Sequence, residues 1–248
     1  MIEKLGKTAG RVQSIRLLRM LLKITLLILF IHLLLQFLNL NVYHQQNGQI
    51  YELSNRFDFD DESSVPSWFS QALFLAIGVF ALLAAYLQTK KAQRRLWGII
   101  ALLGLVCSID EVAALHERVL QTIHVTFYQD ASPTGLDNAW WIIAPLLLIV
   151  GGWLVWMMVR LLPRRTMLLF VVSGTTFLVG AVVVDLITSV VSREWFLNQG
   201  ILVAAEEIVE LLASVFALYA IADYLEGNHG TALSNAARQL KPAGREKS

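Results

Sequence analysis

Apolar residues along this chain gather in long stretches that are separated by short polar segments. A helix needs about 20 residues to cross a bilayer, and six stretches are long enough, near 18–40, 66–88, 96–120, 139–162, 167–191 and 200–225. The first is too long for a signal peptide, so we expect a retained helix. The pattern predicts an all-α polytopic membrane protein, with one six-helix transmembrane domain over residues 1–226 and a flexible cytoplasmic tail over 227–248.

Composition agrees with the membrane class. The chain of 248 residues is 56% hydrophobic and 16% charged, against about 25% charged in an average soluble domain, and its mean hydropathy is +0.58. The net charge is only +1. This balance gives no reason to expect a nucleic-acid partner, and the lipid bilayer is the first predicted partner.

Basic residues predict the orientation. They precede the first stretch, connect the second to the third and the fourth to the fifth, and recur in the tail. The positive-inside rule then places both termini in the cytoplasm, with the chain in a cell inner membrane. Trp97 falls at a predicted inner boundary, as expected of an interfacial aromatic belt. The basic residues of these four groups are Lys4, Lys7, Arg11, Arg16, Arg19, Lys90, Lys91, Arg94, Arg95, Arg160, Arg164, Arg165, Arg238, Lys241, Arg245 and Lys247.

Carboxylates within the apolar stretches are the strongest functional signal. A charge at the centre of a bilayer costs at least about 2.5–3.5 kcal/mol, so intramembrane acids usually serve a function. In the predicted orientation the acids that we singled out share the outer half, which faces the periplasmic or extracellular side, and the inner half is expected to hold none. They are Asp110, Glu111 and Glu117 with His116 on the third stretch, Asp185 on the fifth, and Glu206, Glu207 and Glu210 on the sixth.

Helical geometry groups these acids further. Asp110 and Glu117 are seven residues apart, which puts them on one face of a continuous third helix. The three glutamates of the sixth helix fall within an arc of about 100°. Such a group of carboxylates is not stable when all of its members are ionised and unpaired. A bound metal, shared protons or a water-filled vestibule would each stabilise it.

The ligand types suit a divalent metal. Carboxylates with an imidazole are typical of zinc, manganese or iron sites, and all-oxygen sites suit magnesium. Glu111 and Glu207 are the candidate general bases. None of the six apolar stretches contains a Glu-x-x-His pair, whereas a di-iron bundle usually carries one on each of two helices, which disfavours a di-iron oxidase. The predicted metal ligands are Asp110, His116, Glu117, Asp185, Glu206 and Glu210.

Other polar residues have plainer interpretations. His32 is either a further nitrogen ligand or, more often for such a residue, a satisfied core histidine. His229 is predicted to lie on the surface. The loop 41–65, with acids at Asp58, Asp61 and neighbouring positions, is predicted to be a solvated acidic loop.

Two motifs carry a resemblance. Residues 108–118 read Ser-Ile-Asp-Glu-Val-Ala-Ala-Leu-His-Glu-Arg, and residues 206–212 read Glu-Glu-Ile-Val-Glu-Leu-Leu. They are similar to the Ser-x-Asp-Glu-x4-His-Glu and Glu-Glu-x2-Glu motifs of an uncharacterised family of bacterial multi-pass membrane proteins. The resemblance implies that the two motifs form one site. It implies no reaction.

Three functions remain open. The first is a metal-dependent membrane enzyme, such as a hydrolase, that acts on a lipid or lipid-linked substrate. The second is a cation or proton transporter, because chains of intramembrane acids line ion pathways. The third is an accessory or assembly subunit with membrane-protein partners or further copies of itself, in which the acids hold helices together.

Overall fold

The computed structural model describes residues 11–38, 48–59, 61–115, 118–119, 122, 140–180 and 196–239. Every regular element in these ranges is helical, which confirms the all-α class. The elements are α2 (Val12–Leu38), α3 (Gln49–Arg56), α4 (Val65–Tyr86), α5 (Lys91–Ala113), α7 (Trp140–Leu161), α8 (Arg164–Leu178) and α10 (Phe196–Gln239).

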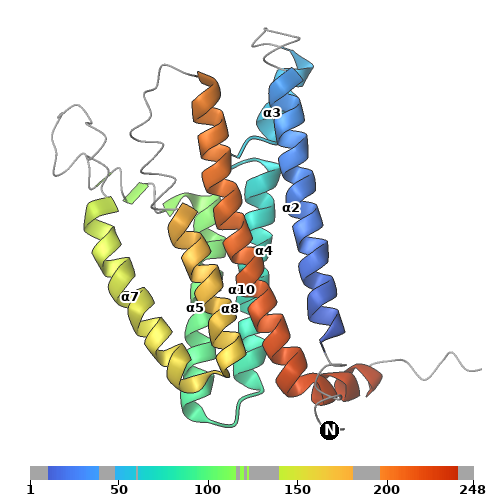
Figure 1. The fold of residues 1–248 in the computed structure, drawn as a ribbon, viewed down its shortest axis with the longest axis vertical. Helices are drawn as coiled ribbons and strands as arrows, with labels where there is room; N and C mark the ends of the chain where they lie inside the picture. Colours follow the sequence, from blue (N-terminus) through green and yellow to red (C-terminus); the bar gives the residue numbers. More distant parts are fainter. Residues whose placement is uncertain are drawn as a thin grey trace, which may run out of the picture.

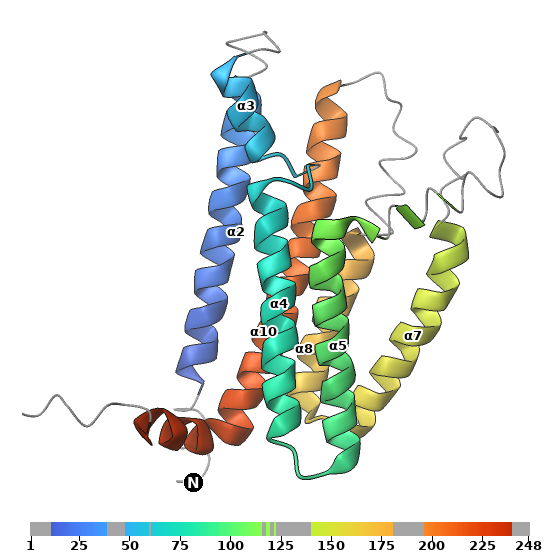
Figure 2. The same ribbon diagram turned by 180° about the vertical axis from the view of Figure 1, so that it is seen from behind.

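The long helices run roughly alongside one another, with α10 between α2 and α8 (Figure 1). Helix α10 packs against α8, α2 and α4, and α4 packs along α5. Seen from behind, α7 stands at the edge of the bundle and leans away from α5 (Figure 2). Helix α2 begins and α10 ends at the same end of the bundle (Figure 1), which we call the inner end because α5 and α8 begin there with basic residues.

The α4–α5 hairpin is the closest helix pairing. Ser64 caps α4 by accepting a hydrogen bond from the Ser67 N–H, and a proline follows in the first turn. Farther along, a Cβ atom added to Gly104 would lie 2.7 Å from the backbone nitrogen of Gly78. Such backbone contact needs small residues on both helices, as is common between membrane helices.

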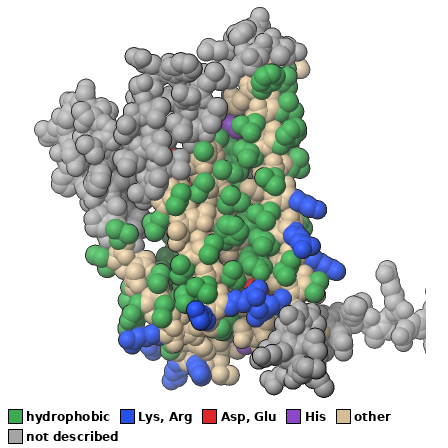
Figure 3. Space-filling view, viewed as in Figure 1, with side chains coloured by type: hydrophobic (Ala, Val, Ile, Leu, Met, Phe, Trp, Pro, Cys, Tyr) green, Lys and Arg blue, Asp and Glu red, His purple; other side chains and the backbone are tan. Residues whose placement is uncertain are grey.

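Within the described ranges, four helices are long and apolar enough to cross a membrane: Val12–Leu38, Val65–Tyr86, Lys91–Ala113 and Ala204–Thr231, the last within α10. Large apolar side chains on their outer faces are exposed, including Leu26, Phe30 and Phe37 on α2. Hydrophobic side chains cover the middle of the molecule, and lysines and arginines gather toward the inner end (Figure 3). These features fit a multi-pass membrane protein.

Two predicted boundaries differ from the structure. The third helix was expected to run to residue 120, but α5 ends at Ala113. The sixth was expected to end near residue 225, but α10 continues to Gln239, through the first part of the predicted flexible tail. Trp97, expected at the interface, is 0% exposed and packs against Tyr224 of α10 and Phe170 of α8. It is therefore a core residue.

Candidate functional site

The first acidic pair lies at the outer end of α5. Asp110 and Glu111 are both half-buried, and neither is without an interaction partner. Four residues after Asp110, the backbone of Ala114 takes the left-handed conformation with φ 48° and ψ 41°, and its N–H donates to the carbonyl oxygen of Asp110 at 2.8 Å. Left-handed geometry is strained for a residue other than glycine. The helix therefore stops within the acidic motif.

This ending removes the premise of one geometric prediction. Asp110 and Glu117 were placed on a common face by assuming that one regular helix joins them. The left-handed Ala114 breaks that helix, and Glu117 lies outside the described residues, so the common face stays a prediction. Sequence alone gave no warning, because alanine is the best helix former and not a usual C-cap.

The second acidic group lies on α10. Glu206, Glu207 and Glu210 are half-buried, and each has an interaction partner. A Cβ atom added to the buried Gly180, just beyond α8, would lie 3.0 Å from Cγ of Glu210 and 3.3 Å from the carbonyl oxygen of Glu206. The chain has a π-type turn at residues 179–180, and such turns occur frequently at functional sites. The missing side chain of Gly180 leaves room for Glu210.

The remaining predicted site residues, His116, Glu117 and Asp185, lie outside the described residues. Among the residues that are described, no group of three or more His, Cys, Asp or Glu side chains is arranged to hold a metal ion. Convergence of the two acidic motifs on one metal therefore stays a prediction.

His32 proves to be a core histidine that joins α2 to the outer loop. It is 3% exposed, its Nδ1 lies 2.9 Å from the carbonyl oxygen of Phe57, and its ring meets Phe59 edge-on at 5.0 Å. A carbonyl oxygen only accepts, so Nδ1 carries the proton. The loop itself is ordered at Asp61, where the hydroxyl and the N–H of Ser63 donate to Oδ1 at 2.7 and 2.8 Å. These bonds hold the pKa of Asp61 below its ordinary value of 3.8.

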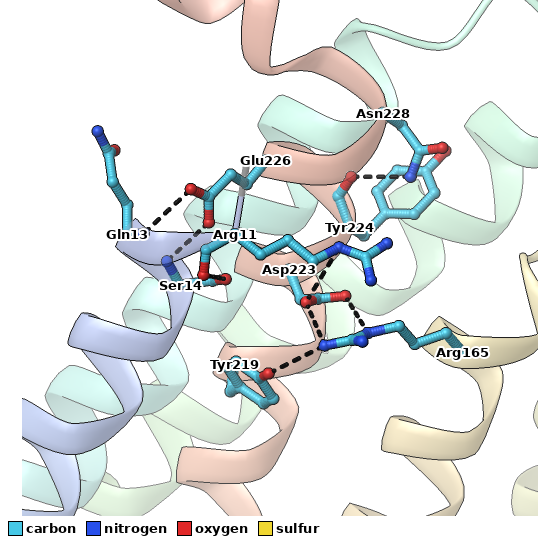
Figure 4. A network of polar contacts seen from close by, with 9 residues as sticks. All are labelled: Arg11, Gln13, Ser14, Arg165, Tyr219, Asp223, Tyr224, Glu226 and Asn228. Carbon is cyan, nitrogen blue, oxygen red and sulfur yellow. Dashed lines mark hydrogen bonds and ion pairs between the residues drawn. The ribbon is translucent and has the colours of Figure 1, made fainter. Parts of the chain in front are cut away.

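A second polar cluster, which sequence reasoning missed, lies at the inner end (Figure 4). Asp223 of α10 is 1% exposed. Arg165 of α8 donates to both of its oxygens, from Nε to Oδ2 at 3.0 Å and from Nη2 to Oδ1 at 2.9 Å. Nε of Arg11 lies 3.6 Å from Oδ1. We call Arg11, Arg165, Tyr219 and Asp223 the inner charge cluster. The expectation that the inner half holds no acid is wrong.

The contacts of Arg165 explain how this charge is tolerated. Its Nη2 also lies 3.4 Å from the hydroxyl oxygen of Tyr219. Burial opposes the charge of the guanidinium, but the hydrogen bonds and the charge of Asp223 outweigh it and raise the pKa of Arg165 above its ordinary value. A paired, bidentate contact of this kind is the usual form of a buried ion pair.

Glu226, one helical turn beyond the cluster, ties α10 to α2. Its two carboxylate oxygens accept the backbone N–H groups of Gln13 at 3.0 Å and Ser14 at 2.8 Å. The first N–H groups of a helix have no partner within the helix, and the helix dipole favours a negative charge there. Glu226 therefore caps α2 from another helix.

His229, predicted to lie on the surface, belongs to a third polar group. The side-chain amide of Gln88, which is 5% exposed, donates from Nε2 to the carbonyl oxygen of Ala84 at 2.9 Å and lies 3.2 Å from Nε2 of His229. Oε1 of Gln88 accepts a hydrogen bond from the Tyr224 hydroxyl at 3.0 Å. Since Gln88 Nε2 is a donor, Nε2 of His229 accepts.

The signal for the inner charge cluster was present in the sequence. Asp223 meets the same criterion as the outer acids, because it is an ionisable residue inside an apolar stretch. Arg11 and Arg165 were explained as orientation signals, which hid their second role. Their partner could not be named, because Arg165 and Asp223 are 58 positions apart.

A known protein family matches most of this chain. Residues 21–224 match a family described as a domain of unknown function (DUF8692). The chain belongs to this family. The DUF8692 region holds both acidic motifs, together with Arg165, Tyr219 and Asp223, and ends before Glu226. No curated protein and no solved structure matches the chain.

Proposed function

We propose that this protein binds a divalent metal ion through the outer carboxylates and acts as a metal-dependent enzyme on a lipid or lipid-linked substrate. The single observation that supports this most is the backbone geometry beside the acids. Regular α-helix ends beside both acidic motifs, at the left-handed Ala114 and after Leu178, where a π-type turn follows. Strained or irregular backbone clusters at binding and active sites.

Gly180 supports the proposal because it leaves the Glu210 side chain room beside the end of α8. Half-buried carboxylates suit a cation because the low local dielectric strengthens the attraction.

The proposed ligands are Asp110, Glu206 and Glu210, with His116, Glu117 and Asp185 as further ligands from the flanking segments. Glu111 and Glu207 are the proposed general bases, which would take a proton from an attacking water. The metal would supply Lewis acidity and lower the pKa of that water.

The membrane setting belongs to the same proposal. We place six spans in a cell inner membrane, with α7 and α8 opening the fourth and fifth, and both termini in the cytoplasm. The basic residues at the inner end support this orientation through the positive-inside rule. The acidic motifs would then open toward the periplasmic or extracellular side.

Transport is the second candidate, and Asp223 is the observation that favours it. With this residue, acids occur in both halves of α10. However, Asp223 is held in a bidentate ion pair with Arg165, whereas an acid that carries protons or cations must release its partner during each cycle. We therefore rank transport below metal-dependent chemistry.

Metal content of the purified chain tests the proposal. Protein prepared without chelators and then loaded with zinc, manganese, iron or magnesium is expected to retain one of them stoichiometrically. The Glu206→Gln/Glu210→Gln variant, which removes two proposed ligands, is expected to lose it. Glu52→Gln is the matched control, because Glu52 is an exposed acid of α3 and its loss is expected to leave metal content unchanged.

Either of two results would refute the metal site. One is a wild-type chain that retains no metal after loading, and the other is a folded double variant that retains as much as the wild type. In the first case, cation and proton flux in liposomes becomes the next measurement for the transport candidate.

A further inference from the structure

The inner charge cluster carries more positive than negative charge. Two guanidinium groups, from Arg11 and Arg165, flank the single carboxylate of Asp223 (Figure 4). The next acid along α10, Glu226, is already bound to backbone N–H groups of α2. One carboxylate neutralises one of two neighbouring cations, so the like charges repel each other unless an anion joins them.

Both guanidinium groups also keep hydrogen-bonding capacity. Within the described chain, Arg165 uses Nε and Nη2 in its bonds to Asp223 and Tyr219, which leaves Nη1 to bind another group. Nε of Arg11 is buried and points toward Asp223 at 3.6 Å, so the two terminal nitrogens of Arg11 are the ones that can reach another group. The side chains of Arg11 and Arg165 are 30% and 49% exposed. A planar fork of donors matches a phosphate group well.

The surroundings indicate what kind of anion fits. Exposed aliphatic side chains lie within one or two turns of the arginines, toward the middle of the bundle. Val12 and Ile15 of α2 are 46% and 36% exposed, and Leu168 of α8 is 47% exposed. A phospholipid matches this arrangement. Its negatively charged head group would lie at the inner end, and its apolar acyl chains would run along these residues.

We propose that Arg11 and Arg165, positioned by the buried Asp223, form a binding site for the phosphate of an anionic phospholipid. Asp223 fixes the guanidinium of Arg165, and Gly227 lets Arg11 lie across α10, because a Cβ atom there would approach Nη2 of Arg11 to 3.2 Å. Basic pockets between membrane helices at the cytoplasmic surface typically hold lipid headgroups. This site is separate from the outer acids and does not depend on the proposed metal.

Native mass spectrometry of the full chain in a nonionic detergent tests the site. Phosphatidylglycerol is titrated beside phosphatidylcholine, which has the same phosphodiester without net negative charge. The wild-type chain is expected to prefer phosphatidylglycerol, and Arg11→Gln is expected to weaken that binding about fivefold, as the loss of one basic residue near an anionic surface does. Binding of phosphatidylcholine is expected to stay unchanged.

Arg19→Gln is the matched control, because Arg19 is an exposed arginine two turns farther along α2 and is expected to leave phosphatidylglycerol binding within twofold of wild type. Equal losses in the two variants would overturn the proposal in favour of diffuse surface attraction. Displacement of the lipid by millimolar inorganic phosphate would overturn it in favour of a soluble anion. If Arg11→Gln does not fold, Arg11→Lys tests the planar fork alone, since it keeps the charge, and a loss of phosphatidylglycerol binding smaller than fivefold is expected.

Discussion

The carboxylates at the two ends of the bundle lie in different backbone surroundings. At the inner end, Asp223 has a bidentate arginine partner and Glu226 has two backbone N–H partners, so each buried or half-buried carboxylate meets a donor from another helix. At the outer end, Asp110 and Glu111 lie in the last turn of α5, which ends at the strained Ala114, and Glu210 lies against Gly180.

The difference separates charges whose bonds join helices at the inner end from acids that lie beside irregular backbone at the outer end. Paired charges at the inner end connect α2, α8 and α10, so their loss is expected to be felt as a loss of stability. The outer acids lie where the backbone is irregular, and functional sites commonly sacrifice stability in this way. Substitutions at the two ends should therefore differ in their effects.

The largest expected effect is at Arg165. Replacing it with alanine leaves Asp223 as a buried charge, and removal of one partner of a buried ion pair costs about 3–5 kcal/mol. Arg11 at 3.6 Å offsets part of this, so we expect the lower limit of that range. Reversible unfolding in mixed detergents measures it. The double variant Arg165→Met/Asp223→Leu should recover most of the loss, and failure to recover would show that the guanidinium does more than balance Asp223.

A smaller effect is expected at Glu226. Glu226→Ala removes the cap of α2 and should cost about 1 kcal/mol, the usual value for a lost helix cap. Glu226→Gln keeps an acceptor oxygen and should cost less. Unfolding measured as for Arg165 gives both values, and an equal cost for the two variants would argue against capping.

Gly180→Ala sharpens the view of the outer end. The added methyl group would lie 3.0 Å from Cγ of Glu210, so the flexible glutamate must shift by a few tenths of an ångström. We expect the stability to fall by less than about 1 kcal/mol, while the affinity for the proposed metal falls about tenfold, as is typical when support for a ligand is disturbed. Metal titration and unfolding of the same sample separate the two effects. A large loss of stability with unchanged affinity would make Gly180 a packing residue only.

The smallest effect is expected at Ala114. In Ala114→Gly, the glycine adopts the left-handed conformation without strain, but the buried methyl group of the alanine is lost. The relief of strain and the lost burial nearly cancel, so the stability of Ala114→Gly should lie within about 0.5 kcal/mol of wild type. Ala101→Gly in the middle of α5 is the control and should cost about 1 kcal/mol or more. Equal costs at both positions would indicate that α5 continues as a regular helix through residue 114.

The sequence predicted the positions of some helices better than the roles of the residues near the inner end. Helices α2 and α4 were expected near their observed ranges, because a long apolar stretch bounded by polar residues is a local property. Trp97 was misjudged, because a tryptophan near a helix end is equally suited to an interface and to a core, and only its neighbours Phe170 and Tyr224 decide.

At the outer end the sequence identified the acids to examine, which are Asp110, Glu111, Glu206, Glu207 and Glu210. It did not predict the left-handed Ala114 that follows Asp110, or the contact of Gly180 with Glu210. A left-handed alanine has no signature in composition or periodicity. The role of Gly180 is equally hidden, because the Glu210 side chain that fills the space comes from a different helix.

By itself, then, the sequence determined the helical membrane class, the approximate positions of the apolar helices and the candidate acids, since each depends on the cost of placing particular residues in an apolar medium. Tertiary structure decided which charges are paired. The cap from Glu226 to Ser14 spans 212 positions, and the Arg165–Asp223 pair spans 58. Contacts between such distant positions follow from how α10 packs between α2 and α8, and no local pattern encodes them.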